Sequence, residues 1–141
     1  MPDLRRALDA PALEPEPADR ALDPDAQPRK GADDPLWPQR RRWRRLVDEV
    51  LPAEAARRQM GPRARHWPVR LNHCFARIIL DAVCEGSWRE TIPPPAWRNM
   101  DARTLARALA LGEDIRRGRA DLWALDAASL SMRGKAPKRR A

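Results

Sequence analysis

The positions of the prolines limit where this chain can form helices. Five of its 15 prolines fall between Pro11 and Pro28, among acidic side chains and alanines and without a sustained apolar stripe. Proline removes a backbone N–H and clashes with the preceding helical turn, so no helix can run through this stretch. Its composition also offers too little apolar surface to bury a core. We therefore expect residues 1–36 to form a disordered acidic tail.

The character of the sequence changes at Arg40, where an amphipathic helix is predicted. Its apolar residues follow the spacing i, i+3, i+4, i+7 and i+8 of a helix that covers a core: Trp43, Leu46, Val47, Val50 and Leu51. Pro52 is expected either to end this helix or to stand in the first turn of the next, residues 53–60. Gly61 and Pro62 stop that second helix.

Residues 66–86 are expected to form the central helix of the fold. Pro68 is placed for a helix start and Gly86 for a C-terminal cap. The predicted buried face of this helix is strongly apolar: Leu71, Phe75, Ile78, Ile79, Ala82 and Val83.

Three further elements are predicted after the central helix. Residues 87–100 read as a long ordered loop, with three consecutive prolines that enforce an extended stretch. A helix over residues 102–117 has Asp101 as its N-cap and Gly118 at its end. A last helix, residues 121–132, presents three leucines to the core: Leu122, Leu125 and Leu130.

No segment alternates between apolar and polar residues as a half-buried strand does. The sequence therefore predicts an all-α fold, a small helical domain of about four to five helices. The domain is expected to span residues 37–135, after the disordered tail and before a basic tail at residues 136–141.

The charge is strong and unevenly placed. The whole chain carries +8, but residues 1–36 hold five basic against nine acidic side chains, so the positive charge belongs to the remainder. A basic domain with an acidic arm suits an anionic partner for which the arm competes. A second interpretation is that the basic charge reflects a general bias of the sequence toward arginine and not a function. Only three of the 28 basic residues are lysines.

One polar row on the central helix is the best candidate for chemistry. His73, Arg77 and Asp81 follow one another at i+4 steps and so share one side of a helix. In an enzyme, His73 would serve as acid/base, Arg77 as anion clamp and Asp81 as the orienting carboxylate. Three other side chains complete the candidate pocket: Asn72, Trp88 and Trp97. The alternative is a helix face that is tied by salt links.

An arginine-rich face is the candidate for anion binding. Its members are Arg41, Arg44, Arg45, Arg65 and Arg70. Such a face can follow a phosphate backbone while a tryptophan stacks on a base, although Trp43 belongs to the apolar stripe and is expected in the core.

Metal, nucleotide and membrane sites are not indicated. The few soft ligands form no CxxC or HxxxH pair, and no glycine-rich phosphate loop occurs, so we expect no metal and no cofactor. Cys74 and Cys84 lie about 15 Å apart along one predicted helix, too far to bridge. No apolar run approaches the roughly 20 residues of a membrane span, and we expect a cytoplasmic protein.

The chain also resembles a known family over about two thirds of its length. The resemblance lies in RRLVDEVLPAEAARR, WPVRLNHCFARIILDAVCEGSWRE, PAWRNM, LARALALGEDI and SLSMRGK. This family consists of small uncharacterised bacterial proteins, some of which carry the label of GNAT-type N-acetyltransferase. That label implies a mixed β-sheet and an acetyl-CoA loop of the form [RQ]xxGx[GA]. Around Gly118 the chain has Ile115 where the loop needs Arg or Gln.

Taken together, these features favour a helical interaction or adaptor domain that binds a protein partner. Two alternatives stay open. One is an N-acetyltransferase-like enzyme, which rests on the family label. The other is a nucleic-acid-binding protein that uses its arginine-rich face.

Overall fold

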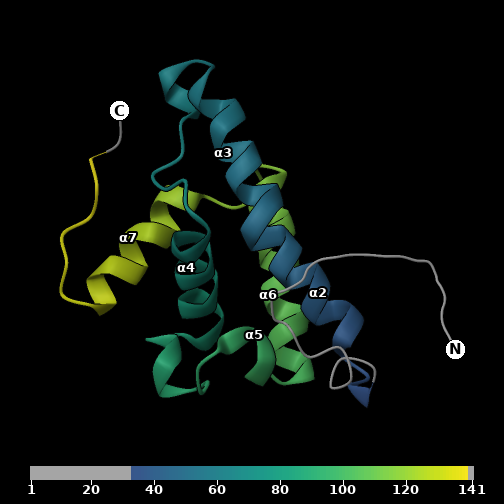
Figure 1. The fold of residues 1–141 in the computed structure, drawn as a ribbon. Coiled ribbons are helices and arrows are strands. Elements are labelled where there is room, and N and C mark those ends of the chain that lie inside the picture. The colour runs from purple at the N-terminus through teal and green to yellow at the C-terminus, as the bar shows by residue number, and fades with distance from the viewer. Residues whose placement is uncertain (1–32, 140–141) are drawn as a thin grey trace, which may run out of the picture. The chain divides into compact units, whose positions relative to one another are not determined.

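Helices and short helical turns make up the regular structure of residues 33–139, the part of the chain that the computed structural model describes (Figure 1). No strand occurs within these residues, which confirms the predicted all-α fold. Of the predicted disordered tail, residues 1–32 lie outside the described part. Pro38–Ala141 form one compact unit.

One uninterrupted helical stretch opens the domain. It consists of α2 (Trp37–Arg45), a π-helical segment η1 (Leu46–Val50) and α3 (Leu51–Gln59). Pro52 stands in the first turn of α3, yet the chain does not break there, since Val50 and Leu51 keep helical backbone angles. The wider π turn just upstream accommodates a proline ring that would clash with a regular preceding turn.

The central helix α4 (Asn72–Cys84) is shorter than the sequence suggested. Its predicted start at Pro68 is wrong, because Leu71 is still extended, with φ −103° and ψ 149°. A residue before proline is also biased away from helical angles, which keeps Trp67 out of the helix. The connector between α3 and α4 contains only the 3₁₀ turn η2 (Arg63–Arg65).

The C-terminus of α4 is capped by a left-handed residue, but that residue is Glu85 and not the predicted Gly86. Glu85 has φ 56° and ψ 39°, and the N–H of Gly86 donates to the carbonyl of Asp81 at 3.1 Å. This is the bonding pattern of a Schellman cap. It is closed here by a side chain that the left-handed region disfavours.

Residues 87–100 contain two short helical segments, η3 (Trp88–Glu90) and α5 (Ala96–Asn99). Ile92, Ala96 and Met100 are the buried residues of this stretch. Trp88 and Trp97, two members of the candidate pocket, are half-buried.

Helix α6 (Ala102–Arg116) follows the prediction closely. The carboxylate of Asp101 accepts the N–H of Thr104 at 2.8 Å, which confirms the N-cap, and Gly118 has φ 77° just after the helix. Gly112 lies where α6 crosses η1, because a Cβ at this position would collide with the side chain of Leu46 and come within 3.6 Å of Ile79.

Helix α4 lies at the centre of the fold, as predicted. It packs against η1, α3, α6, η3 and the last helix, α7 (Leu122–Met132). Phe75, Ile78 and Ile79 are fully buried there. Figure 1 shows α7 on one side of α4 and the α2–α3 stretch and α6 on the other.

The inward face of α7 differs from the prediction. Of the three leucines expected to face the core, only Leu122 is buried, while Leu125 and Leu130 are half-buried. The positions that α7 buries instead are Asp126 and Ser129.

Candidate functional site

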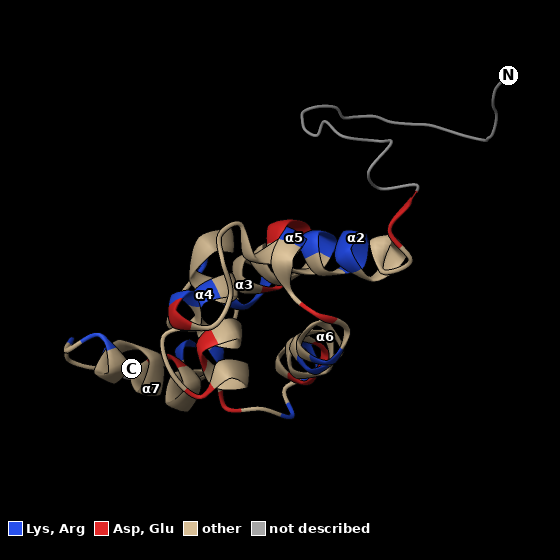
Figure 2. Cartoon of the chain, turned by 90° about the horizontal axis from the view of Figure 1, so that it is seen from below, with Lys and Arg blue, Asp and Glu red and all other residues tan. Residues whose placement is uncertain are grey.

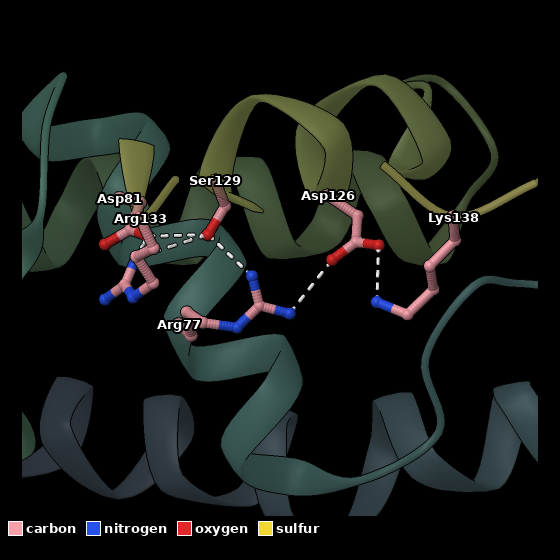
Figure 3. Close-up of polar contacts among 6 residues, drawn as sticks. All are labelled: Arg77, Asp81, Asp126, Ser129, Arg133 and Lys138. Atoms are coloured by element: carbon pink, nitrogen blue, oxygen red, sulfur yellow. Dashed lines mark hydrogen bonds and ion pairs between the residues drawn. The ribbon is translucent and has the colours of Figure 1, made fainter. Parts of the chain in front are cut away.

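The interface between α4 and α7 is built from charged and hydroxyl side chains. Figure 3 shows its six members, which we call the α4–α7 polar cluster: Arg77, Asp81, Asp126, Ser129, Arg133 and Lys138. Two come from α4, two from α7 and two from the segment that follows α7. The cluster therefore ties the C-terminal end of the described chain to the central helix.

Asp81 anchors one half of the cluster. Its side chain is 0% exposed. Its carboxylate accepts the hydroxyl of Ser129 at 2.6 Å and the backbone N–H of Trp88 at 3.0 Å, and it forms an ion pair with Arg133. One carboxylate thus joins α4 to α7, to η3 and to the start of the C-terminal segment.

Asp126 anchors the other half and is 1% exposed. Its two oxygens take different cations: Oδ1 accepts from Arg77 at 2.9 Å, and Oδ2 accepts from Lys138 at 2.9 Å. Arg77 also donates to the hydroxyl of Ser129 at 2.7 Å, which connects the two halves. Asp81 is thus matched by one cation and two neutral donors, and Asp126 by two cations, as buried charges require.

The geometry fixes what the cluster can do. Ser129 is 1% exposed, its hydroxyl proton is directed to Asp81 and its oxygen accepts from Arg77. A nucleophile needs access to a substrate and a base that can take its proton. Ser129 lies too deep for that role, and the cluster acts as a structural clamp.

His73 does not join this cluster. Its side chain is exposed, in the first turn of α4, next to Asn72. Two residues at i and i+4 differ in direction by about 40° around the helix axis. Arg77 and Asp81 therefore point toward α7, whereas His73 points to one side of it. The structure brings two members of the predicted row together through Ser129 and leaves the proposed acid/base outside.

Two of the three residues of the predicted pocket, Asn72 and Trp88, lie at opposite ends of α4. Asn72 opens α4 and donates to Asp48 at 3.0 Å, whereas Trp88 follows the other end of the helix. At about 1.5 Å per residue, the 13-residue helix separates them by roughly 20 Å. Trp97 lies under the guanidinium group of Arg44, which is 4.7 Å from the ring centroid.

The five arginines of the predicted anion-binding face fall into two groups. Arg44 and Arg45 on α2 each face an acidic residue one turn on, Asp48 and Glu49, at 3.9 Å. Arg41 is exposed on the same helix. The other two, Arg65 and Arg70, are exposed on the connector between α3 and α4. Figure 2 shows the basic positions along α2 and the mixed charges of α6.

The cysteines and histidines form no site in residues 33–139. Cys74 and Cys84 are both free, and no group of three or more potential metal ligands occurs among the described residues. Burial raises the pKa of the Cys84 thiol, and the nearby carboxylate of Asp81 raises it further. Both causes disfavour the reactive thiolate. Within the same residues, no helix combines the length and the apolarity of a membrane span.

Four members of the cluster were not predicted: Asp126, Ser129, Arg133 and Lys138. The sequence does contain a signal for three of them, since residues 126, 129 and 133 follow steps of three and four and so share one helix face. The leucines of the same helix predict a different buried face. Lys138 lies in the predicted basic tail, and no periodicity marks it.

No family model, no curated protein and no solved structure matches this chain.

Proposed function

We propose that this helical domain is a cytoplasmic interaction module whose outer α7 face binds a helical segment of a partner protein. The observation that carries the proposal is the composition of that face. It consists of Ala124, Leu125, Ala128, Ser131 and Met132, all exposed except the half-buried Leu125, and it bears no charged side chain.

Helix α7 reverses the usual arrangement of a surface helix. Such a helix normally turns apolar residues to the core and charged residues to water. Here the buried positions include Asp126 and Ser129, while the exposed positions are two alanines, a serine and a methionine. Met132 is 42% exposed, which places a large apolar side chain at the end of this face. Exposed apolar side chains do not stabilise a helix that faces water, but they do stabilise a helix that packs against a partner.

The surrounding charge indicates what kind of partner fits. No acidic residue occurs after Asp126, and Lys135, Lys138 and Arg139 follow α7. A partner helix with an apolar face and acidic flanking residues would match both the outer α7 face and its basic border. The alanines allow close approach of the partner backbone.

The enzyme alternative has less support from the same residues. His73 is exposed, and Arg77 and Asp81 are engaged in the clamp. The described residues contain no assembled set of nucleophile, base and orienting group of the kind that a catalytic site needs.

The test is capture of a partner by the full chain, compared with two charge variants. Ala128→Glu places a charge against the apolar face of the partner helix, where it has no counter-charge, and Ala110→Glu makes the same change on the exposed side of α6. We expect a nuclease-resistant partner that is retained by the parent and by Ala110→Glu and is lost from Ala128→Glu. A partner that all three proteins retain, or self-association that accounts for the whole signal, would contradict the proposal.

A further inference from the structure

The connector between α3 and α4, residues 60–71, contains three arginines and no acidic residue. Between Glu54 and Asp81 the sequence contains six arginines, two histidines and no acidic residue. Arginines on α2 and α6 have acidic residues within one turn, as in the pairs Arg44–Asp48 and Arg116–Glu113. The connector therefore combines a high positive charge with the absence of local counter-charges.

Three arginines of the connector are available to a ligand. Arg63, Arg65 and Arg70 are exposed, and within residues 33–139 no hydrogen bond or ion pair engages their guanidinium groups. The contrast with other arginines is direct. Arg57 and Arg58 are held by Glu54, with N–O distances of 2.5 and 2.9 Å.

The backbone of the connector is held in place. The carbonyl of Arg65 accepts from Arg58 at 3.4 Å, and the carbonyl of His66 accepts the indole N–H of Trp123 at 2.9 Å. The His66 ring bonds to the carbonyl of Gly61 at 3.1 Å. These bonds hold the backbone between Gly61 and His66, the segment that carries Arg63 and Arg65, so less backbone entropy is lost when these two residues bind a ligand.

Trp67 faces inward. Its ring meets the buried Phe75 edge-on with 5.6 Å between centroids, and Arg58 covers it at 4.6 Å. Arg58 thus covers a face of the ring on which a base would otherwise stack. Any ligand of the connector is therefore recognised through its charge and not through an aromatic platform.

We propose that the connector binds the phosphodiester backbone of a nucleic acid through Arg63, Arg65 and Arg70, without sequence preference. A guanidinium group matches the geometry of a phosphate and can donate two parallel hydrogen bonds to it. This surface lies on the α3–α4 connector and shares no residue with the outer α7 face. The two proposals can therefore be tested separately.

An anionic membrane is the competing ligand and is less favoured. Met60 and Leu71 are exposed at the two ends of the connector, at 89% and 57%. Membrane-surface proteins commonly anchor through tryptophan or tyrosine at the interface. The connector's aromatic ring, Trp67, is committed to the core.

The test measures binding of the full chain to a labelled mixed-sequence RNA of about 20 nucleotides, long enough for one site. It is repeated with vesicles of phosphatidylglycerol and phosphatidylcholine. The decisive variant combines Arg63→Ala, Arg65→Ala and Arg70→Ala. The matched control removes three exposed arginines elsewhere: Arg42→Ala, Arg103→Ala and Arg107→Ala.

We expect the connector variant to lose at least about tenfold in RNA affinity and to lower the slope of log K against log salt by about 2, because three phosphate contacts are lost. The control variant should bind within about threefold of the parent. Equal losses in both variants would mean that only net charge matters, and they would overturn the proposal. Binding to vesicles but not to RNA, or to neither, would also overturn it.

Discussion

The central helix α4 is held by two different kinds of interface. On one side, it packs against η1 and α6 through apolar side chains, and the crossing is close enough that a Cβ at Gly112 would displace the side chain of Leu46. On the other side, it holds α7 through the α4–α7 polar cluster, with Asp81 and Asp126 buried. The same helix is thus fixed by shape on one side and by charge on the other.

The two interfaces differ in how strictly they fix the position of the helix that they hold. An apolar interface tolerates changes that conserve volume, because its energy is spread over many weak contacts. A buried ion-pair cluster fixes one register, since any displacement leaves a charge without its partner. We infer that the apolar side stabilises the domain and that the polar side sets the position of α7.

The largest effect is expected from removing the anchor of the polar side. Asp81→Ala leaves Arg133 without its counter-charge and Ser129 and the Trp88 N–H without their acceptor. We expect a loss of about 3–5 kcal/mol in the free energy of unfolding, measured with urea. The control Asp114→Ala removes an exposed carboxylate and should change the free energy by about 0.5 kcal/mol or less. Similar values for the two variants would show that the buried cluster contributes little.

The apolar side is tested by overpacking. Gly112→Val places a branched side chain against Leu46 and Ile79 where α6 crosses η1. We expect a loss of about 1–3 kcal/mol in the free energy of unfolding. Gly86→Ala is the matched control, since nothing lies within 4 Å of its Cβ position, and it should be nearly neutral. A neutral Gly112→Val would mean that the crossing is looser than described.

A double-mutant cycle compares a buried ion pair with a surface one. The Arg77–Asp126 pair has side chains 19% and 1% exposed, against 44% and 38% for Arg44–Asp48. Alanine cycles should give a coupling of about 1–3 kcal/mol for the buried pair and below about 0.5 kcal/mol for the surface pair. Equal couplings would remove the distinction between the polar cluster and ordinary surface salt links.

A stabilising change is expected at the C-terminus of α4. Glu85→Gly relieves the left-handed conformation at φ 56° and removes a negative charge from a helix C-terminus. The predicted gain is about 1 kcal/mol in the free energy of unfolding, seen as a higher melting temperature. A lower melting temperature would indicate that the Glu85 side chain has a role of its own.

The smallest effect concerns the cap of α6. The Thr104 N–H holds the pKa of Asp101 below its ordinary value of 3.8. Because the folded-state pKa is depressed, the cap stabilises the fold above the ordinary aspartate range and is lost as the pH falls through the lowered pKa. Asp101→Asn keeps a capping oxygen but cannot titrate. Its melting temperature should therefore fall less than that of the parent between pH 5 and pH 2, as thermal unfolding followed by circular dichroism would show.

The apolar side was predictable from the sequence and the polar side was not. Periodicity located Phe75, Ile78 and Ile79, and capping chemistry located Asp101 and Gly118, because these signals are local. Buried charges give no such signal, since Asp126 looks like any exposed acid until Arg77 and Lys138 are known to face it. The row of His73, Arg77 and Asp81 was read correctly as a shared helix side, but what lies opposite each member depends on tertiary packing.

The central claim is that the polar cluster, and not apolar packing, holds α7 on α4. Amide hydrogen exchange of the parent and of Asp126→Ala, followed by mass spectrometry, tests it most directly. We expect Asp126→Ala to lose protection in α7 (Leu122–Met132) while α6 (Ala102–Arg116) keeps its protection, because the apolar side is untouched. Equal loss in both helices, or unchanged protection in α7, would contradict the account.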